Sequence, residues 1–186
     1  MNKYFATCPR GLESLLAGEL AALGATQAVA VAGGVQFAGD WSTCYRANLE
    51  SRLATRVLWH VAKGPYAREE DIYRLAAGQD WPHLFPVSRT LRVLTTANHS
   101  PLRSIDFVTL RVKDAICDCF RARGGERPSV DTRDPDVRIH VFLTENECTL
   151  YLDTSGAPLW QRGLRRASVE APLKENLAAG ILRLSG

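Results

Sequence analysis

The clearest pattern along the chain is an alternation of hydrophobic and polar positions over residues 137–153. The hydrophobic positions of this stretch are Val137, Ile139, Val141, Leu143, Leu150 and Leu152. A period of two places successive side chains on opposite faces of a strand, so we predict two half-buried strands. Glu145-Asn146 supplies the turn between them, and Pro135 predicts that the first strand begins after it.

Upstream of this hairpin the period changes to that of a helix. A helix is predicted from Ser104 to Gly124-Gly125, and its hydrophobic face consists of Ile105, Val108, Val112, Ala115, Ile116 and Cys119. A shorter helix around Ile72 and Leu75 is expected to end at Trp81-Pro82. A strand is predicted at Leu91, Val93 and Thr95.

The first 65 residues show their own order of elements. A strand at Phe5-Ala6 precedes a helix of spaced leucines that ends at Gly24, and two strands flank Gly33-Gly34. Asp40 is a candidate N-cap for a helix that carries Trp41, Cys44, Tyr45 and Leu49, and Val57, Trp59 and Val61 form a further strand. The order β-α-β-β-α-β predicts a ferredoxin-like domain over 1–65 and an α+β fold.

Composition and charge narrow the class of protein. The chain is 46% hydrophobic and 23% charged, as expected of a folded protein. It lacks an apolar run of about 18 residues and a signal-peptide core, so we expect a cytoplasmic protein. The net charge of +3 lies entirely in residues 154–186, because residues 1–153 hold equal numbers of basic and acidic side chains.

Catalytic and metal chemistry find little support in the residue pattern. The five cysteines form no C-x-x-C pair, and the four histidines are scattered, so we expect free thiols and no metal site. Cys8 and Cys148 are more consistent with small buried side chains than with nucleophiles. Asp131, Asp134 and Asp136 favour turn and cap roles over a calcium loop.

Several strings resemble known families. Lys113-Asp114-Ala115-Ile116, Arg127-Pro128 and the hairpin ending in Asp153-Thr154-Ser155-Gly156 resemble a THUMP domain over about 67–160. Arg10-Gly11-Leu12-Glu13, Ser51 to Arg56 and Ala171 to Ala179 extend the similarity to the bacterial large-subunit rRNA guanine-N2 methyltransferases of the RlmL type.

The resemblance implies a domain plan and a function. Residues 66–160 would be the RNA-binding THUMP domain, and residues 161–186 a linker and the first helix of a Rossmann-like methyltransferase domain. The glycine-rich motif for S-adenosylmethionine and the Asn-Pro-Pro-Tyr-like motif do not occur, so we expect an inactive fragment without bound cofactor. The resemblance also places Lys174 and Glu175 near the cofactor pocket of the full-length enzyme.

The expected partner is large-subunit ribosomal RNA, with neither a membrane nor a metal involved. Arg162, Arg165 and Arg166 with the preceding Trp160 suit phosphates and an unpaired base. Lys113, on the polar side of the long helix, is a further candidate, and the resemblance adds Arg127 and Arg138. A buried Trp160 and solvated arginines remain the alternative for this segment.

The last helix is predicted from Pro172 to about Leu184. Its hydrophobic stripe of Leu173, Leu177, Ile181 and Leu184 should be buried elsewhere, or the helix should fray. Two other functions stay open for the chain. These are an RNA module of a tRNA methyltransferase or thiolation enzyme, and a protein-interaction domain that pairs through sheet edges.

Overall fold

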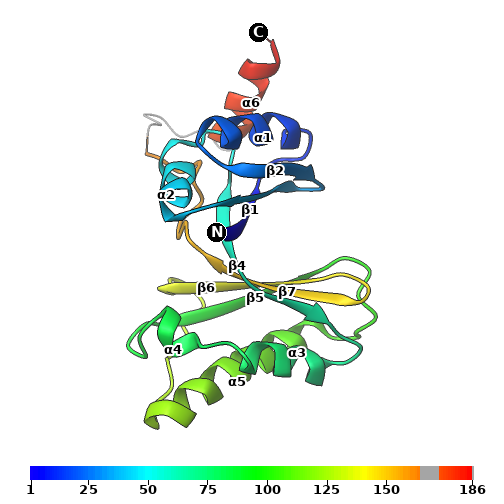
Figure 1. Cartoon of the computed structure of the whole chain (residues 1–186), viewed down its shortest axis with the longest axis vertical. Coiled ribbons are helices and arrows are strands. Elements are labelled where there is room, and N and C mark those ends of the chain that lie inside the picture. Colours follow the sequence, from blue (N-terminus) through cyan, green and yellow to red (C-terminus); the bar gives the residue numbers. More distant parts are fainter. Residues whose placement is uncertain (164–171, 186) are drawn as a thin grey trace. The chain divides into compact units, whose positions relative to one another are not determined.

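The computed structural model describes residues 1–163 and 172–185 (Figure 1). The chain divides into two compact units, one formed by 1–59 with 154–186 and the other by 60–153. The second unit is therefore inserted into the sequence of the first. The α+β class predicted from the sequence is confirmed.

Unit 1 contains the first six elements in the predicted order. They are β1 (Asn2–Thr7), α1 (Glu13–Ala22), β2 (Thr26–Val31), β3 (Gly34–Gly39), α2 (Trp41–Glu50) and the start of β4 (Arg56–Pro65). The strand order is β2-β3-β1-β4, and the pairs β2–β3, β3–β1 and β1–β4 are antiparallel. The β-α-β-β-α-β prediction is confirmed.

The core of unit 1 follows from the alternation along its strands. Tyr4 and Ala6 of β1 face Phe37 and Val35 of β3 in register, and all four side chains are buried. Leucines of α1 complete this core. On α2 the buried residues are Thr43, Cys44 and Ala47, whereas Trp41, Tyr45 and Leu49 are exposed.

The turn between β2 and β3 requires both of its glycines. Gly33 has a φ of +82°, which glycine adopts without strain. Gly34 lies so close to β1 that a Cβ there would stand 2.2 Å from the Ala6 carbonyl oxygen and 2.7 Å from the Phe5 ring. The predicted tight hairpin is therefore confirmed, and each glycine has a separate reason.

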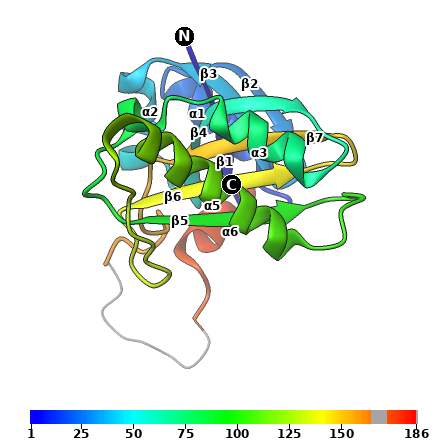
Figure 2. The ribbon, with the colours of Figure 1, turned by 90° about the horizontal axis from the view of Figure 1, so that it is seen from below.

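Unit 2 combines a mixed sheet with helices. Its elements after the end of β4 are α3 (Glu69–Ala77), α4 (Trp81–Leu84), β5 (Leu91–Ala97), α5 (Ile105–Gly124), β6 (Val137–Leu143) and β7 (Glu147–Asp153). Its strand order is β4-β7-β6-β5. β6 and β7 are antiparallel and β5 and β6 are parallel, as Figure 2 shows.

Helix α5 begins and ends where its sequence predicts. The Ser104 hydroxyl accepts the Phe107 N–H at 3.2 Å, and Gly125 ends the helix with a φ of +78°. The buried face of α5 differs from the predicted one near its two ends, because Ile105 is partly exposed and Phe120 is buried. Phe120 packs on Phe85, which follows α4, at a centroid distance of 5.1 Å, and this partner comes from tertiary packing.

Helix α6 (Glu175–Ser185) turns a different face inward from the one predicted. Asn176 and Gly180 are buried, whereas Leu173, Ile181 and Leu184 are exposed. Of the two expected outcomes, burial of the stripe is therefore wrong for these three residues. A Cβ on Gly180 would overlap the Leu12 side chain, so the glycine permits close contact with Leu12 within unit 1. Leu177 alone of the stripe packs against that core.

No helix within 1–163 or 172–185 is long and apolar enough to cross a membrane. The same ranges hold no group of three histidine, cysteine, aspartate or glutamate side chains arranged to bind a metal ion.

Candidate RNA-binding surfaces

Arg162 is fixed to the C-terminal end of α2. Its guanidinium donates to the carbonyls of Leu49 at 2.7 Å, Asn48 at 2.9 Å and Ser51 at 2.9 Å. The last carbonyls of a helix lack intrahelical partners and carry the negative end of its dipole, so a cation there is favourable. The structure thus gives Arg162 a capping role that its sequence did not predict.

Glu19 binds the same turn as a hydrogen-bond acceptor, whereas Arg162 is a donor. Its carboxylate accepts the Ser51 hydroxyl at 2.7 Å and the N–H groups of Arg52 and Leu53 at 3.1 and 3.3 Å. It also pairs with Arg183 of α6 at 2.9 Å, and the Glu19 side chain is 7% exposed. This network was missed from the sequence, because no local motif joins residues so far apart.

Trp160 and Lys174 lie together beside the start of α6. The Lys174 Nζ is 5.9 Å from the centroid of the Trp160 ring, within the range of a cation–π contact. Trp160 borders a small cavity of about 100 Å³ with Arg52, Arg162, Glu175 and others. A half-buried aromatic ring beside cationic side chains is suited to an unpaired base and its phosphates.

The same cavity borders Glu175, which the resemblance places near the cofactor pocket of the full-length enzyme. Ligand pockets for molecules of cofactor size usually measure about 300–1,000 Å³. The cavity that Glu175 borders is about 100 Å³, and Lys174 lies over Trp160. The position of Lys174 and Glu175 near the cofactor pocket of the full-length enzyme stays a prediction.

The remaining candidates lie in unit 2. Lys113 pairs with Asp114 at 2.7 Å, and Arg138 Nη2 stands 3.6 Å from Asp134 Oδ1. Arg127 is exposed and forms no hydrogen bond or ion pair with the described part of the chain. Lys113 and Arg127 both lie near Cys117, whose pKa burial raises and these cations partly lower.

The structure therefore divides the predicted residues between its units. Trp160, Arg162, Lys174 and Glu175 belong to unit 1, and Lys113, Arg127 and Arg138 belong to unit 2. Arg165 and Arg166 lie outside the described residues. Arg92, beside Arg138 on the neighbouring strand, was not singled out in the sequence.

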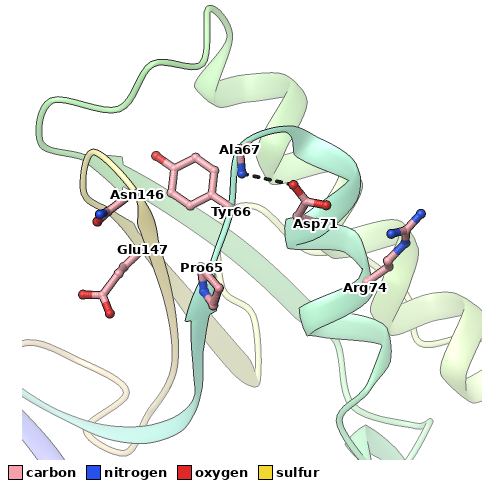
Figure 3. Close-up of a pocket in the computed structure, with 7 residues that line it drawn as sticks. All are labelled: Pro65, Tyr66, Ala67, Asp71, Arg74, Asn146 and Glu147. Atoms are coloured by element: carbon pink, nitrogen blue, oxygen red, sulfur yellow. Dashed lines mark hydrogen bonds between the residues drawn. The ribbon is translucent and has the colours of Figure 1, made fainter.

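A shallow pocket in unit 2 contains no reactive pair (Figure 3). It is lined by Pro65, Tyr66, Ala67, Asp71, Arg74, Asn146 and Glu147 and measures about 770 Å³. Asp71 accepts the N–H groups of Ala67 and Arg68, which lower its pKa, and Glu147 pairs with Lys63 at 2.8 Å. Both carboxylates of the pocket thus have structural partners.

The cysteines have the properties of buried thiols. Burial raises the pKa of Cys8 to about 11 and that of Cys148 to about 12. A thiol with such a pKa is almost fully protonated at neutral pH and is a weak nucleophile. The interpretation of Cys148 as a small buried side chain is confirmed by its complete burial.

Each of the two units contains a match to a known family. Residues 3–58 match the model of the RlmL ferredoxin-like domain, and residues 66–153 match that of the THUMP domain. The chain thus carries an RlmL-type ferredoxin-like domain followed by a THUMP domain. In this RlmL-type chain the THUMP match ends where the chain returns to unit 1, at Thr154.

Solved structures support the same assignment. The RlmL-type chain is 30% identical to a predicted N6-adenine-specific DNA methylase from Listeria monocytogenes, with a TM-score of 0.87, and the match covers 98% of this chain and 48% of that one. It is 28% identical to TrmN from Thermus thermophilus, with a TM-score of 0.78, covering 99% and 54%. The chain thus spans about half the length of these relatives.

A third structure concerns the cofactor of a relative. The putative methyltransferase SMU.472, complexed with SAH, is 27% identical with a TM-score of 0.85, and the match covers 98% of this chain and 48% of that one. The Listeria monocytogenes relative and SMU.472 are thus described as a predicted methylase and a putative methyltransferase.

Proposed function

We propose that this chain is the RNA-binding portion of an S-adenosylmethionine-dependent methyltransferase that modifies the exocyclic N2 of a guanine in large-subunit ribosomal RNA. The observation that carries the proposal is the succession of an RlmL ferredoxin-like domain and a THUMP domain in one chain. In this proposal the chain holds a folded RNA segment in the cytoplasm, and a catalytic domain supplies the methyl transfer.

The basic side chains of unit 1 fit this role. Arg52 and Lys174 lie around Trp160, and Arg52 forms no ion pair with the described residues. Cations neutralise backbone phosphates, and an aromatic face stacks on an unpaired base. We assign RNA contact to Trp160 and Lys174 here, with Arg165 and Arg166 as further candidates in the adjoining segment. Arg162 itself is bound to the end of α2.

A role in tRNA modification is the second candidate. The fold is shared with a 4-thiouridine synthetase solved in complex with RNA, at 14% identity and a TM-score of 0.53. The similarity to TrmN is higher and covers nearly all of this chain. Such an enzyme would prefer a tRNA to a segment of ribosomal RNA.

A competition experiment separates these candidates. The full chain is bound to a labelled large-subunit rRNA fragment, and unlabelled rRNA fragment, tRNA and duplex DNA are added as competitors at one salt concentration. We expect the rRNA fragment to compete at the lowest concentration. Stronger competition by tRNA would favour the second candidate, and equal competition by duplex DNA would contradict selective RNA recognition.

Catalysis is assigned elsewhere and is tested separately. With S-adenosylmethionine and the rRNA fragment, we expect no methyl transfer by this chain, because the motifs for S-adenosylmethionine and for the target base do not occur in its sequence. Measurable turnover that is lost with heat-denatured protein would contradict this part of the proposal.

A further inference from the structure

Two arginines stand side by side at the edge of the sheet of unit 2. β5 is the last strand of this sheet and lies beside β6 (Figure 2). The two strands pair in parallel, with Arg92 in register with Arg138. Neighbouring strands are about 4.8 Å apart, and residues in register point to the same face. Leu91 and Val93, which alternate with Arg92, are buried against the helices, so both arginines lie on the opposite face.

Such a pair is unfavourable unless an anion lies between its members. Like charges directly opposite each other on adjacent strands destabilise a sheet. The Arg138 side chain is only 18% exposed, so solvent screens its charge incompletely. The sheet edge therefore favours a shared acceptor at this position.

Among the described residues, the two arginines have one hydrogen bond and one long ion pair. Arg92 donates one hydrogen bond, from Nη1 to the Thr132 carbonyl at 2.7 Å. Arg138 is 3.6 Å from Asp134, beyond hydrogen-bond range, and the Asp134 side chain is 99% exposed. An exposed ion pair of this kind contributes little, so another anion can displace Asp134 easily.

In the loop before β6, Asp131 and Asp136 already have hydrogen-bond or ion-pair partners. Asp131 accepts the N–H groups of Arg133 and Asp134 at 2.8 and 3.1 Å. Asp136 accepts the Thr90 N–H and hydroxyl and pairs with Arg89 at 3.0 Å. Asp134 is thus the carboxylate of this loop that is left to face Arg138.

We propose that Arg92 and Arg138 together bind one backbone phosphate of RNA, which replaces Asp134 as their shared counter-ion. The guanidinium fork matches the two free oxygens of a phosphodiester, and two forks at adjacent strands can hold one phosphate between them. This inference rests on the proposed RNA-binding function. To that function the inference adds the position of one phosphate. It also adds that the Asp134 carboxylate competes with this phosphate for the two arginines.

Substitutions within the full chain test the site by titration with a labelled large-subunit rRNA fragment over a salt series. We expect Arg92→Ala and Arg138→Ala each to weaken binding about tenfold and to reduce the salt slope by about one. Because both side chains hold the same phosphate, the double variant should lose little more than either single variant. Asp134→Asn should tighten binding severalfold.

The ion pair between Asp80 and Arg123 provides matched controls in the same unit. Both side chains are more than half exposed, and their N–O distance is 2.9 Å. Arg123→Ala and Asp80→Asn make the same charge changes, and we expect each to alter affinity by less than about twofold. Circular dichroism checks whether each variant folds. If Arg138→Ala does not fold, Arg138→Lys takes its place, because lysine keeps the charge without the guanidinium fork. We expect Arg138→Lys to bind with intermediate affinity.

The outcomes separate this site from the general function. Binding by the unaltered chain with no difference between the Arg92, Arg138 and Arg123 variants would overturn the phosphate site alone. Weaker binding by Asp134→Asn would also overturn it. Failure of the unaltered chain to bind the RNA at all would contradict the proposed function itself.

Discussion

Arg162 was a candidate for phosphate contact because of its charge, and the structure gives it a structural role. Its guanidinium donates to three carbonyls at the end of α2, so removing it leaves these acceptors without their partner. We expect Arg162→Ala to lower the free energy of unfolding by roughly 1–3 kcal/mol, measured by urea denaturation. Arg162→Lys is the matched control, because it keeps the charge without the forked donors and should restore little of the loss. Full stability in Arg162→Ala would contradict the capping role.

Gly34 is a second residue whose role depends on a single contact. A Cβ at this position would stand 2.2 Å from the Ala6 carbonyl oxygen, which belongs to the paired strand and cannot move away freely. We expect Gly34→Ala to destabilise unit 1 by more than about 2 kcal/mol, seen as a lower thermal midpoint. Gly33→Asn is the comparison, since nothing lies within 4 Å of its Cβ and asparagine tolerates positive φ, and a loss as large as that of Gly34→Ala would count against this explanation.

Asp40 links one titratable side chain to the stability of α2. Its carboxylate accepts the Thr43 N–H at 2.8 Å, and this bond lowers the Asp40 pKa. The stabilisation is therefore complete above the ordinary pKa of about 4 and is lost as the pH falls through the lower folded value. Asp40→Asn keeps a capping oxygen but cannot titrate, so we expect little change at pH 7 and a shallower loss of stability in acid. An unchanged acid limb in urea titrations would refute the assignment.

At the scale of elements, the docking of α6 is the feature that depends most on one small residue. Gly180 packs against Leu12 of unit 1, and Asn176 donates to the Leu53 carbonyl and the Thr55 hydroxyl. We expect Gly180→Val to separate the helix from this surface and to speed amide hydrogen exchange across residues 175–185. Leu182→Ala, at an exposed position of the same helix, should leave exchange unchanged. Equal exchange in both variants would contradict this packing.

Elements with strong local signals could be predicted from the sequence. The hairpin of β6 and β7, the long α5 with its Ser104 cap and the turn at Gly33-Gly34 depend on periodicity and caps, which neighbouring residues determine. The buried face of α6 could not be predicted in the same way. Its leucines suggested one face, but contact with Leu12 selected the face with Gly180. Tertiary packing decided this case against the hydrophobic pattern.

The candidate site was predictable only in part for a related reason. Trp160 and the basic segment after it stood out by composition, and the structure places Trp160 beside Lys174. The partners of Arg162 and Glu19, and the pairing of Arg92 with Arg138, depend on contacts between distant parts of the sequence. A register between two strands cannot be inferred from the charge of either strand alone.

For the whole molecule, the two units share one proposed task. The THUMP match over 66–153 and the basic side chains around Trp160 in the other unit both suit RNA. Contacts between arginine or lysine and phosphate release counter-ions from the RNA. The affinity of the whole chain should therefore depend strongly on salt.

The most direct test is the affinity of the full chain for a large-subunit rRNA fragment as a function of salt. If several cations contact phosphates, the logarithm of the association constant should fall linearly with the logarithm of the salt concentration, with a slope of about −2 or steeper. Absence of binding at low salt, or an affinity that salt does not change, would contradict the account.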